Sequence, residues 1–368
     1  MSKLVIGFDA RWYNSSGVGT YVLNLLEGLG EIEGDSSIVV YEHPDNPVPV
    51  SAPNMVKSPV RFHRYSPAGQ LEIAWRCRQD RLDLFHAPFY LVPLLANCPV
   101  VATVHDLIPF LFPIYGLAHR EIVKAGYRVG VRKAARIIAV SATTASDLHR
   151  ILSIPQNRIA VVQLGYSHSL YSRERAPDEE SYLHNKYGIR RPYILTLSAA
   201  NWKTKNLATA LSAMVLARAS SGVEFQIVVA GPEAGLRACG QADKVSDLVA
   251  TGFVPTADLP LLYRNAAAFV AVSRYEGFGL PLLEAMACGC PCIASTGGSL
   301  AEVAGDAAPL FSPDDAAGIA GGIVQILENA QYRDDLSARS IRRATEFSYR
   351  KAAMETFRVY EEAAGAGQ

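Results

Sequence analysis

Short apolar runs alternate with segments of helical periodicity along the first part of the chain. The runs are rich in Val and Ile and have no polar face, which is typical of strands buried on both sides of a parallel sheet. Amphipathic helices are predicted between them, for example at 18–29 and 119–135. The predicted strands are 4–9, 38–41, 82–86, 100–105, 137–141 and 159–163. This alternation predicts a mostly parallel sheet with helices on both faces.

The alternation is interrupted once and then resumes. Residues 165–192 are polar and turn-rich, which indicates a linker region. Further strands, each followed by a helical pattern, are predicted at 193–197, 225–230, 268–273 and 291–294. We therefore predict an α/β chain of two Rossmann-like, doubly wound parallel-sheet domains with a cleft between them.

Composition supports two folded domains. The chain has 368 residues, 49% of them hydrophobic, so it can bury two cores and is not expected to be disordered. Its 35 Lys and Arg residues balance 35 Asp and Glu residues, which argues against a polycation that binds nucleic acid.

The charge is nevertheless uneven. Residues 57–136 hold 12 basic against 5 acidic residues, a net charge of +7. Basic residues four apart predict a ridge along a helix, which is either a solvated surface or a docking surface for an anionic membrane. The residues of this predicted ridge are Arg120, Lys124, Arg128, Arg132, Lys133 and Arg136.

Localisation and metal binding can be judged from two absences in the sequence. No run of about 18 apolar residues is present, and the apolar start is too short for a signal peptide. We expect a cytoplasmic protein that is either free or bound peripherally at the inner face of the membrane. Cys288, Cys290 and Cys292 lack the spacing of zinc sites, so we interpret them as small buried residues and expect no metal.

The candidate ligand-binding residues of the first half lie where predicted strands end, because open parallel sheets bind ligands at the carboxyl ends of their strands. Gly17-Val-Gly19 precedes a helix and is either a phosphate-binding loop or a plain turn. The spacing to Glu42 leaves a nicotinamide-binding site open, although a third fingerprint glycine is missing. His105 ends a buried strand beside Asp106, so it either faces a ligand or is a core histidine.

The second half carries two further motifs. Lys203 and Lys205 lie at a helix entrance after strand 193–197, which indicates an anion site or a solvated loop. Glu276 and Glu284 flank a glycine-rich turn after strand 268–273. Carboxylates accept hydrogen bonds from sugar hydroxyls, and backbone N–H groups of such a turn can hold charged oxygens.

In its motifs the chain resembles the retaining glycosyltransferases of family four, which have the GT-B fold. The resemblance rests on the pair Glu276 and Glu284 within Ser-Arg-Tyr-Glu-Gly-Phe-Gly-Leu-Pro-Leu-Leu-Glu-Ala-Met-Ala-Cys-Gly-Cys-Pro. It also rests on the order of four other segments: Gly17-Val-Gly-Thr-Tyr, Val104-His-Asp-Leu, Lys205-Asn206 and Gly252-Phe-Val-Pro. Nearly the whole chain takes part.

The resemblance implies an acceptor-side domain over 1–170, a linker over 171–192, and a nucleotide-sugar-binding domain over 193–345. A final helix over 346–368 would pack back on the first domain. The implied activity is transfer of a mannose-, glucose- or rhamnose-like sugar, with retention and without a metal or cofactor. The nucleotide diphosphate-sugar would be a co-substrate, and a hydroxyl of a glycan or lipid-linked acceptor in bacterial polysaccharide or lipopolysaccharide assembly would receive the sugar.

The resemblance also implies residue roles. His105, Lys205 and Glu276 would be catalytic: His105 lies beside the donor sugar, Lys205 neutralises the diphosphate, and Glu276 binds sugar hydroxyls. Glu284 would hold the ribose. The remaining implied donor-binding residues are Gly17, Gly19, Ser198, Lys203, Asn206, Phe253, Val254, Gly277, Phe278, Gly279 and Leu280.

One departure from the family pattern concerns the diphosphate. Many members have an Arg after a Gly, seven residues before the Lys, whereas this chain has Ser198 and Ala199 there. Lys203 is our candidate to supply the missing charge. A nicotinamide-dependent oxidoreductase and a non-catalytic two-domain sugar-binding protein are the alternative functions.

Overall fold

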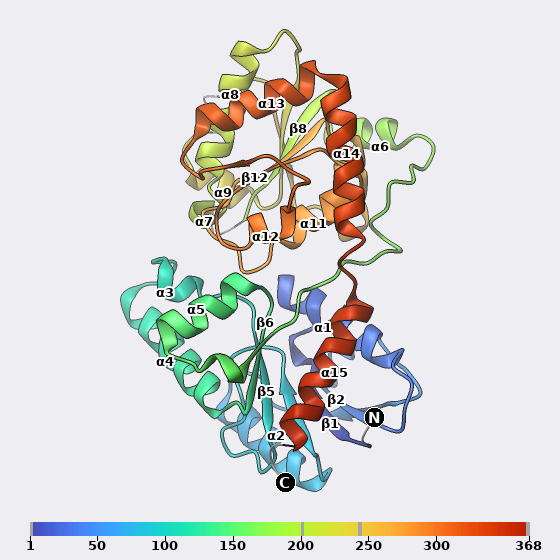
Figure 1. Cartoon of the computed structure of the whole chain (residues 1–368), viewed down its shortest axis with the longest axis vertical. Helices are drawn as coiled ribbons and strands as arrows, with labels where there is room; N and C mark the ends of the chain where they lie inside the picture. Colours follow the sequence, from blue (N-terminus) through green and yellow to red (C-terminus); the bar gives the residue numbers. More distant parts are fainter. Residues whose placement is uncertain (1–2, 200–201, 242–244, 366–368) are drawn as a thin grey trace. The chain divides into compact units, whose positions relative to one another are not determined.

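The computed structural model describes residues 3–199, 202–241 and 245–365 (Figure 1). It divides into two compact units, 1–165 with 347–368, and 166–346. The predicted outer boundaries at residues 1 and 368 lie outside the described residues. Each unit contains one parallel sheet with helices packed on it, as predicted.

The first unit has a seven-stranded sheet in the order β3-β2-β1-β4-β5-β6-β7, and every neighbouring pair is parallel. The six strands expected from the sequence are present. The seventh, β3, is an edge strand whose side chains are mostly exposed, so it lacks the apolar run that marks the others. The strands are β1 (Val5–Asp9), β2 (Ser37–Glu42), β3 (Met55–Pro59), β4 (Leu84–Ala87), β5 (Val100–Val104), β6 (Arg136–Ala139) and β7 (Ile159–Val161).

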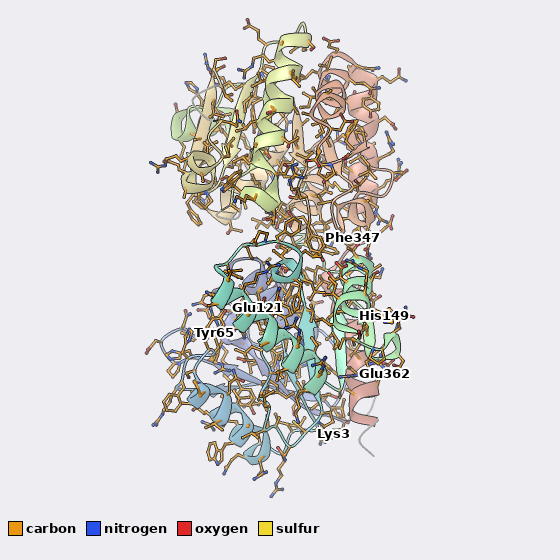
Figure 2. All side chains as sticks on the ribbon, turned by 90° about the vertical axis from the view of Figure 1, so that its left-hand side faces the viewer. Lys3, Tyr65, Glu121, His149, Phe347 and Glu362 are labelled. Atoms are coloured by element: carbon orange, nitrogen blue, oxygen red, sulfur yellow. The ribbon has the colours of Figure 1, made fainter. Side chains whose placement is uncertain are left out.

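Helices of the first unit connect these strands. The helix α1 (Ser16–Gly30) packs against the C-terminal helix α15 (Tyr349–Gly365), which also contacts β4, β5 and β6 (Figure 1). Phe347 and Glu362, labelled in Figure 2, lie near the two ends of this returning segment. The others are η1 (Ala10–Trp12), α2 (Pro67–Gln79), α3 (Ile108–Leu111), α4 (Leu117–Lys133), α5 (Ala142–Leu152) and η2 (Gln156–Arg158).

The second unit has a six-stranded parallel sheet in the order β10-β9-β8-β11-β12-β13. The sequence predicted its four inner strands and missed the two edge strands, β10 and β13. Its strands are β8 (Tyr193–Leu197), β9 (Gln226–Ala230), β10 (Leu248–Gly252), β11 (Ala268–Ala271), β12 (Cys292–Ser295) and β13 (Leu310–Phe311).

The helices of the second unit lie between and beyond its strands, with α13 packed on α8 (Figure 1). They are α6 (Glu179–Tyr187), α7 (Trp202–Lys205), α8 (Leu207–Ser220), α9 (Glu233–Ala238), η4 (Thr256–Asp258), α10 (Leu259–Asn265), α11 (Leu280–Ala287), α12 (Leu300–Ala304), α13 (Ala316–Glu328) and α14 (Ala330–Ala344). As expected, Cys288, Cys290 and Cys292 are buried free thiols where α11 leads into β12.

The segment 171–192, predicted as a linker, differs from that expectation. It belongs to the second unit and contains α6, which packs on α10. Glu179 at the start of α6 is buried and accepts hydrogen bonds from Arg264 at 2.6 Å and from Asn265 at 2.8 Å. Polar contacts with residues far along the chain therefore fold a segment whose own composition indicates a loop.

Candidate active site

The predicted donor-binding residues of the second unit gather at the carboxyl edge of its sheet. Ser198 follows β8, Phe253 and Val254 follow β10, and Glu276 lies in the loop after β11. Lys203 and Lys205 belong to α7, which comes shortly after β8. Ala200 and Asn201, in the same predicted motif, lie outside the described residues.

Lys205 and Glu276 form an ion pair at the centre of this edge. The Nζ of Lys205 donates to Oε1 of Glu276 at 2.7 Å, and the side chains are 27% and 16% exposed. Ser273 donates to the same carboxylate oxygen at 2.6 Å. The sequence interpretation missed Ser273, although its position three residues before Glu276 on the same turn could have suggested it. Both charges are thus held in place and remain partly open to solvent.

The backbone of Glu276 is fixed from the loop after β12. Ser299 donates to the Glu276 carbonyl oxygen through its backbone N and its Oγ, both at 3.1 Å. Gly298 has a positive φ of 64°, and a Cβ there would lie 2.3 Å from that same oxygen. The position therefore requires glycine. A cavity of about 20 Å³ lies beneath the ion pair, lined in part by Gly279 and Leu282.

The predicted glycine-rich turn leads directly into α11. Gly277 and Phe278 form the turn, Gly279 adopts a positive φ of 99° before the helix, and Leu280 is the first helical residue. Pro281 has no backbone N–H, and the N–H groups of Leu282 and Leu283 donate to the Gly279 carbonyl oxygen at 3.0 and 3.3 Å, so the start of this helix is closed by the turn itself.

Glu284 lies one turn further along α11 and is 8% exposed. Burial raises the pKa of the Glu284 carboxyl to about 8, while Tyr171, Tyr263 and the charge of Lys205 act in the opposite direction. Tyr171 and Tyr263 are further residues that the sequence interpretation missed. They are distant from Glu284 along the chain, so no local motif marks them.

The segment after β10 presents one aromatic side chain. Phe253 is 80% exposed, whereas Val254 is buried at 8%. The following turn is held by Asp258, which accepts hydrogen bonds from Lys186 Nζ and from the Tyr187 hydroxyl, both at 2.6 Å. The exposed Phe253 ring therefore lies close to a turn tied to α6.

Asn206 and Ser198 serve the scaffold in this structure. The Asn206 amide nitrogen donates to the carbonyl oxygens of Val272 at 3.0 Å and Pro313 at 2.6 Å. The Ser198 hydroxyl donates to the Pro232 carbonyl oxygen at 3.0 Å. These contacts indicate that both residues position the loops around Lys205.

Lys203 differs from Lys205 in its surroundings. Its side chain is exposed, and Nζ lies 5.7 Å from the centroid of the Trp202 ring. Within the described part of the chain no carboxylate pairs with it. The charge of Lys203 is therefore available to a second anionic group.

In the first unit, Gly17 and Gly19 lie in the first turn of α1. A Cβ at Gly19 would lie 2.1 Å from the Tyr13 carbonyl oxygen, whereas a Cβ at Gly17 would meet nothing within 4 Å. Gly19 is thus needed for close backbone packing. Gly17 leaves open space beside the helix start.

His105 follows β5 in the same unit and is partly buried. Its Nε2 lies 2.9 Å from the Pro88 carbonyl oxygen, which can only accept, so Nε2 carries the proton. Burial lowers the pKa of His105 to about 4. The imidazole is therefore neutral at pH 7, and its Nδ1 can accept a hydrogen bond, for example from a sugar hydroxyl.

The basic ridge is only partly as predicted. Helix α4 ends at Lys133, and Arg136 instead begins β6 and pairs with Glu362 at 2.6 Å. Arg120 donates to the carbonyl oxygens of Pro109 and Phe110. Lys124 pairs with Glu121 at 3.0 Å, so the exposed basic end of the helix consists of Arg132 and Lys133.

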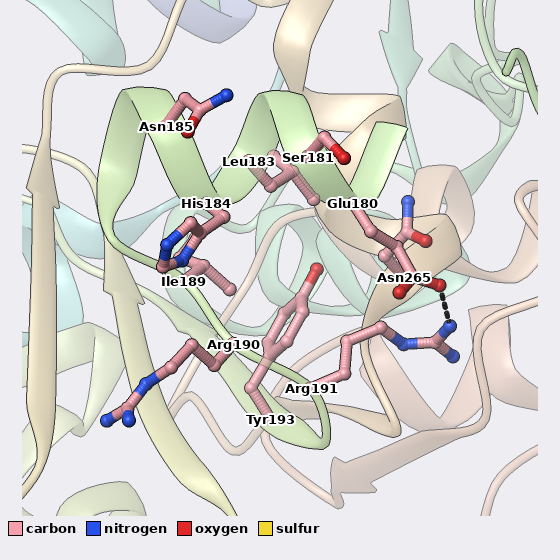
Figure 3. Close-up of a pocket in the computed structure, with 10 residues that line it drawn as sticks. All are labelled: Glu180, Ser181, Leu183, His184, Asn185, Ile189, Arg190, Arg191, Tyr193 and Asn265. Atoms are coloured by element: carbon pink, nitrogen blue, oxygen red, sulfur yellow. Dashed lines mark hydrogen bonds and ion pairs between the residues drawn. The ribbon is translucent and has the colours of Figure 1, made fainter. Parts of the chain in front are cut away.

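A separate pocket in the second unit has a volume of about 340 Å³ (Figure 3). It lies at the amino end of β8, away from the edge that carries Lys205 and Glu276. Figure 3 shows the ion pair between Arg191 and Glu180, 2.5 Å long, and Arg190 pairs with Asp247. Because these charges already have partners, the pocket does not add to the candidate active site.

The described residues include no cluster of three His, Cys, Asp or Glu side chains suited to a metal ion. None of the described helices is both long and apolar enough to span a bilayer.

Comparison with known proteins gives concordant matches along the chain. Residues 15–170 match the family model "Glycosyltransferase Family 4", and residues 181–343 match "Glycosyl transferases group 1". The O-antigen chain mannosyltransferase B of Escherichia coli is 28% identical over 98% of this chain and 99% of its own length. The MMP alpha-(1->4)-mannosyltransferase of Mycolicibacterium hassiacum is 30% identical over 72% of this chain and 66% of its own length.

Solved structures share the fold. The sucrose-phosphate synthase of Thermosynechococcus elongatus has a TM-score of 0.78 at 18% identity, covering 99% of this chain and 100% of that one. The two parallel-sheet units are therefore those of the GT-B fold. A nicotinamide oxidoreductase and a non-catalytic sugar-binding protein do not fit the two family matches. The chain belongs to glycosyltransferase family 4 and is a hexosyltransferase.

Proposed function

We propose that the chain transfers mannose from a nucleotide diphosphate-sugar to a hydroxyl of a glycan or lipid-linked acceptor in bacterial polysaccharide assembly. The Lys205–Glu276 ion pair at the carboxyl edge of the second sheet is the observation that carries this proposal. A cation and a carboxylate held side by side suit a donor that has a diphosphate next to a sugar. The two relatives from Escherichia coli and Mycolicibacterium hassiacum are both mannosyltransferases, which favours mannose as the transferred sugar.

In the proposed reaction, the bond from the sugar C1 to the diphosphate oxygen breaks and a bond from C1 to the acceptor oxygen forms with retention. The acceptor proton leaves with the diphosphate. Lys205 neutralises the leaving group, with Lys203 as the second cation, and Glu276 accepts hydrogen bonds from the sugar hydroxyls. Fixed charges of this kind stabilise a transition state without needing a metal.

The remaining residues complete donor binding in this proposal. Glu284 accepts the ribose hydroxyls, and the segment of Phe253 and Val254 contacts the base. The N–H groups of the 277–280 turn hold donor oxygens. From the first unit, Gly17, Gly19 and the neutral His105 serve the phosphate and the sugar.

A donor screen tests the proposed function. Melting of the full chain is followed with UDP-, GDP-, ADP- and dTDP-sugars and with NAD. A ligand at a hundred times its Kd should stabilise the fold by about 2.7 kcal/mol. We expect one nucleotide-sugar to stabilise the chain and to release its nucleoside diphosphate when a manno-oligosaccharide is added. Stabilisation by NAD alone would contradict the proposal.

We further propose a cytoplasmic location with helix α4 on an anionic membrane surface, where a lipid-linked acceptor is available. Leu117 and Ile122 are 83% and 72% exposed on this helix, and Val129 is 46% exposed. Exposed apolar residues combined with the cations of Arg132 and Lys133 suit an interface of lipid headgroups and acyl chains.

A further inference from the structure

An exposed aromatic and arginine cluster lies in the first unit beside η1. The Tyr65 cluster consists of Trp12, Asn14, Arg64 and Tyr65. The Arg64 guanidinium carbon lies 4.5 Å from the Trp12 ring centroid and 5.5 Å from the Tyr65 ring centroid. Tyr65 is 57% exposed, whereas Trp12 below it is 3% exposed. The position of Tyr65 is marked in Figure 2. No role proposed above uses these side chains.

The loop that carries Tyr65 is fixed by hydrogen bonds from both sides. Arg64 Nη1 donates to the Arg11 carbonyl oxygen at 2.6 Å and to Asn14 Oδ1 at 3.3 Å. Gln70 donates to the Arg64 carbonyl oxygen at 2.7 Å. Arg11, itself paired with Asp9 at 2.7 Å, donates to the Phe62 carbonyl oxygen. An exposed ring on a fixed loop loses little entropy on binding, which is typical of a preorganised recognition surface.

The cluster is continuous with His105 through ring contacts. The Trp12 and Tyr65 centroids are 5.3 Å apart, and those of Trp12 and Phe89 are 4.5 Å apart. Phe89 in turn lies 6.3 Å from the imidazole of His105. Tyr65 is therefore three ring contacts away from the histidine proposed to lie beside the donor sugar. A ligand unit on Tyr65 would be separate from the unit that reacts at His105.

The chemistry of the cluster favours a saccharide. A pyranose has a C–H face that packs on an aromatic ring, and hydroxyls at its edge that need donors and acceptors. The Tyr65 side chain is 57% exposed, with the His63 ring 5.5 Å from it between centroids, and Arg64 and Asn14 supply polar groups beside it.

We propose that the Tyr65 cluster is a distal acceptor subsite, which binds a sugar unit of a glycan acceptor other than the one that receives the new sugar. The proposal rests on the proposed function, because it assumes that the acceptor is a glycan. Such a subsite would make the affinity of the enzyme for a glycan acceptor depend on the length of that acceptor. Short acceptors would reach the transfer site without contacting Tyr65, and longer ones would contact both.

Binding of unlabelled sugars to the full chain tests this without a donor. Saturation-transfer NMR titrations would use methyl α-mannoside and α-linked mannose oligosaccharides of two to four units. We expect affinity to rise with length in the wild type, and Tyr65→Ala to remove about fivefold of that gain, the equivalent of about 1 kcal/mol for an aromatic contact. Tyr65→Phe should keep most of it. Trp75→Ala, also an exposed ring beside an arginine but on α2, is the matched control.

Three results would overturn the subsite. In the first, the wild type binds none of the oligosaccharides. In the second, Tyr65→Ala lowers the affinity for the monosaccharide and for the oligosaccharides by the same factor, and in the third, Tyr65→Ala weakens only the binding of phosphatidylglycerol vesicles. The last result would make the cluster a membrane contact. Donor stabilisation, measured in parallel on Tyr65→Ala, separates the two proposals. If the donor still stabilises this variant but length dependence is absent in the wild type, only the subsite is wrong.

Discussion

At the scale of single residues, Lys205 and Glu276 illustrate how a site is prepared before its ligand arrives. Each charge would be costly to leave unpaired in its partly buried position, and the 2.7 Å ion pair compensates both. A bound diphosphate would take over the cation, and sugar hydroxyls would take over the carboxylate. The pair therefore holds the two groups where the proposed donor needs them.

Replacing Lys205 by Ala should lower kcat about 10²- to 10³-fold, as removal of one transition-state donor does elsewhere. The reason is that the leaving diphosphate loses its fixed cation. Steady-state kinetics with the donor found in the screen would measure the kcat of the variant and of the wild type. Unchanged turnover would contradict the role of Lys205, and unchanged melting of the variant would show that any loss is not caused by unfolding.

Lys203 provides a contrasting variant in the same helix. Because its ammonium is exposed beside Trp202, Lys203→Ala should weaken nucleoside diphosphate binding with little effect on the fold. Calorimetric titration of the nucleoside diphosphate would measure the change in Kd. An unaltered Kd would mean that Lys203 does not replace the arginine found in many family members.

The raised pKa of Glu284 predicts that the stability of the fold depends on pH. Its folded pKa of about 8 lies above the ordinary value of 4.5, so the folded chain holds a proton that the unfolded chain releases. This contribution is complete below pH 4.5 and is lost as the pH rises through 8. The free energy of unfolding should therefore fall between pH 6 and 9 more steeply in wild type than in Glu284→Gln. Equal slopes in urea unfolding would contradict it.

At the scale of elements, one buried hydrogen-bond network joins two helices to the first sheet. The ring nitrogens of His86 in β4 lie 2.5 Å from the Tyr360 hydroxyl of α15 and 2.8 Å from Thr103 Oγ1 of β5. Thr103 in turn bonds the Tyr21 hydroxyl of α1 at 2.8 Å. Tyr21 also packs edge-on against His105 at 4.9 Å. The network thus fixes α1 and His105 relative to each other.

Acid should loosen this network. Burial lowers the pKa of His86 to about 3, below the usual 6.5, so the folded unit binds fewer protons than the unfolded chain. The stability that follows is complete above pH 6.5 and is lost as the pH falls towards 3, by up to about 1.4 kcal/mol per pH unit. His86→Gln should lose less stability between pH 7 and 4 in denaturant unfolding. Equal slopes in the two proteins would contradict the role of His86.

The elements that the sequence predicted are those with local signals. Central strands such as β5 and β9 are buried along their whole length and are apolar except for Thr103 and Gln226. The edge strands β3 and β10 are half-exposed and lack that signal. Helix α6 buries few apolar residues and depends on partners far along the chain, Arg264 and Asp258. Such contacts cannot be identified from one sequence.

The candidate site was predictable to a similar extent. Glu276, Glu284 and Lys205 stand in motifs at strand ends, so both sequence order and chemistry point to them. The partners that orient them are different: Ser273 is one hydroxyl among many, and Tyr171 and Tyr263 approach Glu284 only through the fold. For Arg136, helical spacing was misleading, because the helix ends three residues earlier and the side chain pairs with Glu362.

At the scale of the whole molecule, the zero net charge is an average over unequal parts, and the basic block 57–136 belongs to the first unit. Much of its charge has internal partners, as Arg120 and Arg136 show. Only the charge left at the surface can act on a membrane. The test of membrane docking should therefore address Arg132 and Lys133 rather than the block as a whole.

Cosedimentation of the full chain with phosphatidylglycerol vesicles would test the docking of α4. Each basic residue near an anionic surface contributes about 1 kcal/mol, so Arg132→Gln with Lys133→Gln should weaken binding roughly thirtyfold. Raising the salt from 0.1 to 1 M shortens the screening length from about 10 to about 3 Å and should release the wild type. Arg173→Gln with Arg342→Gln removes two exposed charges from the second unit and should change little. Equal losses in both double variants would point to nonspecific attraction, and salt-insensitive binding would exclude an electrostatic role for the helix.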